Sequence, residues 1–145
     1  MRQPLRPKKL SQAKQFAKIE RISLGGAVAR IGPVGLWLYA SHYSEAARSL
    51  PGPDVPFKPV RYHLVCHAIE LALKAYLSLK QVTMVELSGN PYGHNLGTLL
   101  ATATAQGLDN LVQLTDAQAN EIRKATAYYN GKLFEYPAFG EALTA

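Results

Sequence analysis

Four polar side chains stand at helical spacing on one otherwise apolar stretch, RYHLVCHAIELALKAYL at residues 61–77. They are His63, His67, Glu70 and Lys74, and together they form the polar line. On a helix that turns about 100° per residue, the polar line occupies a sector of about 60°, and apolar side chains cover nearly all the rest. A surface helix gives polar residues a much wider arc. The pattern therefore predicts a central helix that is enclosed on most sides.

Three interpretations of the polar line stay open. It is a thin solvent-exposed strip, a polar network in a groove that binds a ligand or partner, or a metal site. The metal site depends on His63 and His67, which at i and i+4 can face one ion, with Glu70 one turn further along. Lys74 disfavours a cation there, so we predict neither a metal nor another cofactor.

The segment GHN at residues 93–95 opens the next predicted helix and adds a histidine to the candidate site. Glu70 and Lys74 have the i, i+4 order of a helical ion pair. If that pair is buried it needs further hydrogen-bond partners, because unpaired buried charge is costly. The connector before GHN is long enough to bring His94 back to Glu70, with Asn95 as the helix cap. A histidine in this position can equally serve only to secure its loop, but we predict that it joins the polar line.

Four helices are predicted to position these side chains, at residues 33–50, 60–80, 95–107 and 115–130. Pro33 suits a first helical turn, Asn95 is a good N-cap, and Thr115 with Gln118 has the pattern of a capping box. Gly107 and Gly131 are natural helix terminators. Residues 81–95 are predicted to be a connector.

The fold class that follows is all-α, an up-and-down four-helix bundle, with the last eight residues as candidates for a short fifth helix. No alternating strand pattern stands out. The segment ISLGGAVARIGPVG at residues 22–35 is interpreted as a hinge or linker because of its glycines and proline. Residues 1–32 are therefore predicted to be a basic arm and Gly-rich linker, and residues 33–145 the helical bundle.

Length and cysteine content restrict the class of protein. A chain of 145 residues suffices for one domain with one sizeable core. Cys66 is the only cysteine, which rules out an intrachain disulfide and favours a reducing compartment, so we expect a cytoplasmic protein. No stretch has the composition of a membrane span, and the N-terminus lacks the apolar segment of a secretory signal.

The formal net charge of +6 lies entirely in the first 21 residues, which hold seven basic residues and one acid. From residue 22 onward nine basic residues balance nine acids. Such an arm is either a tether to RNA or an anionic surface or a solvated extension. The body has no net charge to keep copies apart, and we predict a homodimer with Trp37, Leu38 and Tyr39 as one candidate apolar surface.

Three segments follow one another in a recognisable order, HAIELALKAYLSLK, YGHNLGTLL and YYNGKLFEYP. The first carries Glu70 and Lys74 four residues apart on a long helix, and the second is a Gly-His-Asn-Leu element that opens the next helix. The third is a tyrosine-containing helix that ends in a basic and aromatic segment with Lys132, Phe134 and Tyr136. In this order and spacing, residues from about 33 to 137 resemble the HEPN-like group of small helical-bundle proteins.

The resemblance implies a bundle that often forms homodimers. Some members of the group are metal-independent ribonucleases, whereas others bind nucleotides, RNA or partner enzymes without catalysis. The nucleases carry an Arg followed by a His after four to six residues, usually on a late helix. Here no histidine follows Arg123 on the late helix, and Arg61 with His67 has the spacing only on the second helix. The expected activity is therefore binding without catalysis.

We predict that a nucleotide, an RNA segment or a protein partner binds through eight residues. These are His63, His67, Glu70, Lys74, His94, Asn95, Tyr129 and Lys132. One alternative is a ribonuclease in which His67 or His94 is the general acid–base and Arg61 or Lys74 stabilises the developing charge on phosphorus. The other is a metal-binding bundle with His63, His67 and Glu70 as ligands. Aromatic residues such as Tyr129 either stack on bases or belong to the core.

Overall fold

A computed structural model describes residues 20–24, 27–52 and 58–131 of the chain. Four helices of ten or more residues form its body, namely α2 (Pro33–Ser49), α3 (Pro59–Leu79), α5 (Leu96–Ala105) and α6 (Asp116–Asn130). A short helix α4 (Met84–Ser88) and a 3-10 turn η1 (Leu108–Asn110) lie in the connections. The prediction of an all-α class is confirmed, and each long helix agrees with its predicted range to within a few residues.

Local sequence explains where these helices begin. Pro33 and Pro59 occupy the first turns of α2 and α3, where a missing backbone N–H costs nothing. The Asn95 side chain accepts a hydrogen bond of 2.9 Å from the backbone N–H of Thr98, and Thr115 forms a complete capping box with Gln118. The predicted caps of α5 and α6 are therefore confirmed.

The connector at residues 81–95 is more ordered than predicted. Thr83 and Glu86 form a second complete capping box, which starts α4. The signal was present in the sequence as Thr followed three residues later by Glu. Leu87 of this short helix is fully buried, so α4 covers one end of the core.

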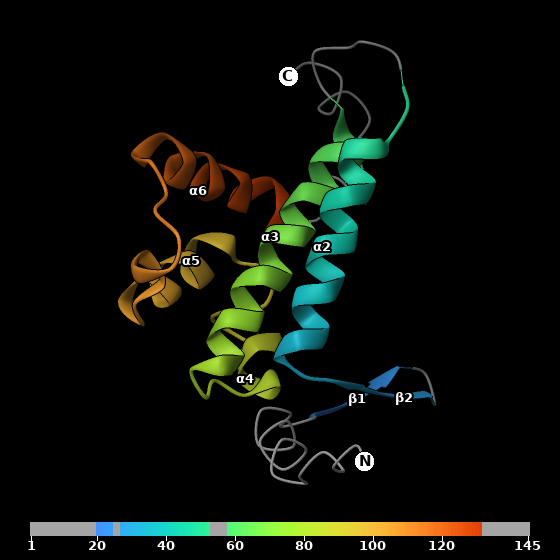
Figure 1. The fold of residues 1–145 in the computed structure, drawn as a ribbon, viewed down its shortest axis with the longest axis vertical. Helices are drawn as coiled ribbons and strands as arrows, with labels where there is room; N and C mark the ends of the chain where they lie inside the picture. The colour runs from blue at the N-terminus through green and yellow to red at the C-terminus, as the bar shows by residue number, and fades with distance from the viewer. Residues whose placement is uncertain (1–19, 25–26, 53–57, 132–145) are drawn as a thin grey trace, which may run out of the picture.

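The interpretation of residues 22–35 as a linker was wrong for the first part of that segment. Strands β1 (Glu20–Leu24) and β2 (Ala27–Ile31) pair antiparallel, with Leu24 opposite Ala27 and Glu20 opposite Ile31. Two short runs that contain β-branched residues and are separated by Gly-Gly are typical of a β-hairpin. The hairpin leads directly into α2 (Figure 1).

The helices pack with α3 at the centre. In Figure 1, α2 and α3 run side by side in opposite directions, while α6 runs across the direction of that pair. Only the α2–α3 part therefore has the up-and-down arrangement of the prediction. The main core joins Leu73 and Leu77 of α3 to Leu99 and Leu100 of α5, with Leu87 of α4 beside them. No helix in the described part of the chain is long and apolar enough to cross a membrane.

Candidate functional site

Glu70 is the centre of a buried polar cluster on α3. Its residue is 2% exposed, and its side chain receives partners at both carboxylate oxygens. The Lys74 ammonium, itself buried one turn further along, donates to Oε1 at 2.6 Å. An ion pair in this setting is held by hydrogen bonds as well as charge, as a buried pair requires.

The second oxygen of Glu70 has partners from outside α3. The Nδ1 atom of His94, in the turn before the N-cap of α5, lies 3.1 Å from Oε2. Tyr129, on the last turn of α6, donates its hydroxyl proton to the same oxygen. His67 completes the arrangement, because its Nδ1 lies 2.7 Å from the Tyr129 hydroxyl and 3.4 Å from Oε2. These residues, Glu70, Lys74, His67, His94 and Tyr129, are the Glu70 cluster.

The predicted convergence of His94 with the polar line is therefore confirmed. Two glycines make the approach possible. Gly93 has a φ of +44°, a conformation that other residues adopt at a cost, and it turns the chain immediately before His94. Gly97 lets α5 approach α6 closely, because a Cβ there would stand 3.3 Å from Oγ1 of Thr126, which accepts a 2.9 Å bond from the Gly97 N–H.

The electrostatics of the cluster keep Glu70 ionised. Burial alone raises the pKa of this carboxyl, but the hydrogen bond from His67, the charge and hydrogen bond of Lys74, and the hydrogen bond from Tyr129 outweigh that effect. The pKa of Glu70 is consequently held well below its usual range. The ion pair with Lys74 leaves Glu70 and Lys74 together without net charge.

The hydrogen-bond directions also set the protonation of the two imidazoles. An ionised carboxylate only accepts, so His94 donates from Nδ1 to Glu70. Because the Tyr129 hydroxyl gives its proton to Glu70, its oxygen accepts from Nδ1 of His67. In both histidines Nε2 is then the atom left for another partner. The His94 side chain is 43% exposed and that of His67 26%, so both are within reach of solvent.

Two further aromatic side chains border the cluster. The ring of His63 stacks parallel to that of His67, with centroids 6.2 Å apart, and its buried Nδ1 has no hydrogen-bond partner in the described structure. Tyr43 of α2 meets His67 edge-on at 4.5 Å. Sequence reasoning missed Tyr43, although its spacing from Ala40 and Ala47 places it on the inner side of α2.

Other predicted site residues lie elsewhere. The Asn95 side chain is engaged in capping α5, and the Arg61 guanidinium donates to the carbonyl oxygen of Leu50 at 2.7 Å, beyond the end of α2. Arg123 bonds to the side chain of its neighbour Asn120. Lys132, the aromatic residues after it and the candidate fifth helix lie outside the described residues.

The described residues offer no ligand set for the metal site that was one interpretation of the polar line. Among the residues that the structure describes, no group of three or more His, Cys, Asp and Glu side chains is placed to hold a metal ion. Glu70, the carboxylate of the predicted triad, already has four neighbouring polar groups.

Comparison of this chain with protein-family models, with curated proteins and with solved structures gave no match. The resemblance to the HEPN-like group accordingly stays a prediction from its three motifs.

Proposed function

We propose that this protein binds a phosphate-bearing ligand, a nucleotide or an RNA segment, through the exposed side of the Glu70 cluster and does not cleave it. One observation carries the proposal, namely that a single buried carboxylate orients two partly exposed imidazoles through their Nδ1 atoms. Imidazoles held in this way present Nε2 in a fixed direction. A hydrogen-bonding atom that is already fixed in direction loses little conformational freedom when a ligand binds.

Charge supports an anionic ligand. Since Lys74 compensates Glu70, each proton gained by His67 or His94 gives the cluster net positive charge. A phosphate oxygen can then accept a charge-assisted hydrogen bond from Nε2. An aromatic ring such as that of His63, which stacks beside the ring of His67, suits contact with a base.

The proposal leaves out cleavage because the described residues of the Glu70 cluster include no cation that is not already paired. Cleavage of a phosphodiester needs a positive group to stabilise the charge that develops on the phosphoryl oxygens. Lys74 is buried against Glu70, and Arg61 bonds to the Leu50 carbonyl. Neither Lys74 nor Arg61 is therefore placed to stabilise the charge on phosphorus in the alternative nuclease.

A ribonuclease is the second candidate, and a specific observation favours it. Two histidines that each bond through Nδ1 to a carboxylate or phenol, with no partner at Nε2 among the residues the structure describes, have the arrangement of general acid–base groups with orienting partners. His67 and His94 would exchange the protons of the attacking and leaving oxygens.

One experiment separates the two candidates. Fluorescence anisotropy of a labelled oligoribonucleotide, and competition by mononucleotides, are measured with EDTA present. We expect binding that is lost in His94→Ala, while His42→Ala, a change of an exposed histidine on α2, behaves as the unaltered protein. Cleavage that survives EDTA and disappears in His67→Ala would establish the ribonuclease instead. Equal binding by His94→Ala and the unaltered protein would reject both.

The predicted homodimer belongs to the same proposal. Trp37, Leu38 and Tyr39 are 58%, 46% and 51% exposed on α2, so their apolar area is accessible to a second copy. We expect light scattering at tens of micromolar to give twice the monomer mass, and Leu38→Asp to return the monomer. A monomer for the unaltered protein would reject this part.

A further inference from the structure

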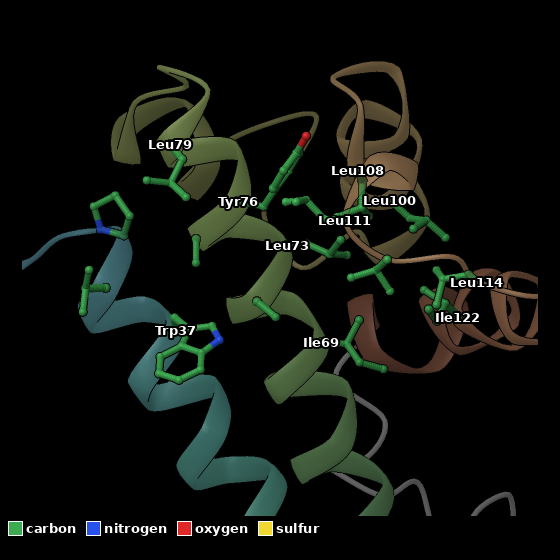
Figure 2. Close-up of a pocket in the computed structure, with 15 residues that line it drawn as sticks. Trp37, Ile69, Leu73, Tyr76, Leu79, Leu100, Leu108, Leu111, Leu114 and Ile122 are labelled. Carbon is green, nitrogen blue, oxygen red and sulfur yellow. The ribbon is translucent and has the colours of Figure 1, made fainter. Parts of the chain in front are cut away.

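The side of α3 opposite the Glu70 cluster borders two connected hollows. The first has a volume of about 530 Å³ and lies between α2, α3 and the α5–α6 region (Figure 2). The second, of about 430 Å³, continues along the groove between α2 and α3. Trp37, Ile69 and Ala72 line both. The two hollows together form one trough that follows α2 from Val34 to Arg48, about 21 Å at 1.5 Å per residue.

The first hollow is concave and almost purely hydrocarbon. Leu73, Leu100 and Leu108 belong to the buried core, whereas Leu79 and Leu111 are more than half exposed at its rim. None of its lining residues carries a charge, and the one phenol, that of Tyr76, donates to the Gln106 carbonyl at 2.7 Å. A hollow of this volume with an apolar lining is of the kind that holds small molecules. Its occupant must itself be apolar where it lies.

The far end of the trough is different in character. Ser41, Ser44, Glu45 and Arg48 of α2 line the second hollow opposite the apolar residues of α3. Glu45 and Arg48 supply one charge of each sign, with hydroxyl groups beside them, so this end offers both donors and acceptors but no net charge. The trough thus combines an apolar slot with a polar, electrically balanced mouth.

We propose that the trough binds a single-chain amphiphile, with its aliphatic chain in the first hollow and an uncharged polar headgroup beside Ser44, Glu45 and Arg48. The chain matches a lining without hydrogen-bonding groups, where a polar tail would lose its hydration. An uncharged headgroup matches the mouth, because a charged one is attracted by one of Glu45 and Arg48 and repelled by the other, so it gains no net attraction for the hydration that it loses. This site lies on the other side of α3 from the phosphate site and does not depend on it.

Trp37 provides a direct readout, because it is the only tryptophan of the chain, lines both hollows and is 58% exposed. The probes are dodecanol, dodecanoate and dodecylammonium, each kept below the concentration at which it aggregates. We expect a saturable blue shift of Trp37 emission, with dodecanol binding most tightly. A response only above the aggregation concentration, or equal binding of all three probes, would overturn the proposal.

Variants test the two ends of the trough separately. Ala72 is exposed and lines both hollows, so Ala72→Phe should block the chain and abolish the shift without unfolding the protein. Val85→Phe is the matched control, since Val85 is 83% exposed on α4 and does not line the trough. Unchanged dodecanol binding by Ala72→Phe would reject the site.

At the mouth the headgroup preference should change sign with the charge that is removed. Glu45→Gln should tighten dodecanoate binding roughly fivefold, because the carboxylate headgroup then faces Arg48 alone. Arg48→Gln should do the same for dodecylammonium, whose headgroup then faces Glu45 alone. No change in either variant would show that the headgroup does not lie there. A blue shift that grows with protein concentration in the absence of amphiphile would show that a second copy fills the trough, which contradicts the proposal.

Discussion

The two sides of α3 differ in whether their side chains have partners inside the protein. On one side Glu70 and Lys74 are buried, and both oxygens of the carboxylate have partners, which together come from α3, the turn before α5, and α6. On the other side Trp37, Leu79 and Leu111 around the trough are left in water. Polar groups removed from water require partners inside the protein, whereas apolar groups in water only forgo burial. The first side therefore specifies the packing of the helices, and the second is free to receive something else.

The largest effect on stability should come from removing the carboxylate at the centre of the Glu70 cluster. Glu70→Ala leaves the Lys74 ammonium buried and unpaired, and we expect it to lower the free energy of unfolding by about 3–5 kcal/mol. The matched control is Glu121→Ala, which removes the carboxylate of an i, i+3 pair with Lys124 at 3.0 Å on the exposed surface of α6. That change should cost no more than about 0.5 kcal/mol. Urea denaturation measures both, and similar losses would remove the distinction drawn between buried and exposed pairs.

Lowering the pH should reduce the contribution of the Glu70 cluster to stability without any substitution. Because the pKa of Glu70 is lowered from its ordinary value of 4.5, its contribution to stability is fully present above that pH. The contribution is lost progressively as the pH falls below 4.5, where the unfolded state binds a proton that the folded state does not. The free energy of unfolding, measured from pH 6 down to pH 3, should fall steeply. Glu70→Gln should flatten this slope, and an unchanged slope would assign the acid sensitivity to other carboxylates.

Tyr129→Phe tests the link between α6 and α3. It removes the hydroxyl that donates to Glu70 and accepts from His67 but keeps the ring. We expect a loss of about 2 kcal/mol, the usual contribution of a hydrogen bond to a charged group. Tyr39→Phe, in which a half-exposed ring on α2 loses its hydroxyl, is the control and should be nearly neutral. Thermal unfolding followed by circular dichroism measures the pair, and equal losses in the two would argue against a structural role for the cluster.

The smallest effect is expected on the trough side. Leu79→Ser and Leu111→Ser change rim residues that are 53% and 73% exposed, so each should alter the free energy of unfolding by less than about 0.5 kcal/mol. Both should nevertheless weaken the binding of dodecanol in the trough, measured by the emission of Trp37. A loss of several kcal/mol would show that these side chains already have a partner, and the two sides of α3 would no longer differ.

Local signals in the sequence determined most of the helical body. Proline in a first turn, Asn95 and Thr115 as caps, and glycine after α5 and α6 act over three or four residues, so they can be recognised without a fold. The sequence also contains local signals for the two elements that were not predicted. These are the capping box of Thr83, which begins α4, and the Gly-Gly between β1 and β2. Helical periodicity likewise set the polar line apart from the apolar face.

The sequence by itself also determined that Glu70 would need partners, because a buried charge on an apolar helix is costly without them. Which partners it has was decided only by the tertiary structure. Tyr129 lies 59 residues further along the chain, and no periodicity relates it to Glu70. It arrives because α5 and α6 approach closely at Gly97, and Tyr43 arrives because α2 packs along α3. The trough has the same origin, since its walls come from helices whose distance apart is fixed by packing and not by any local pattern.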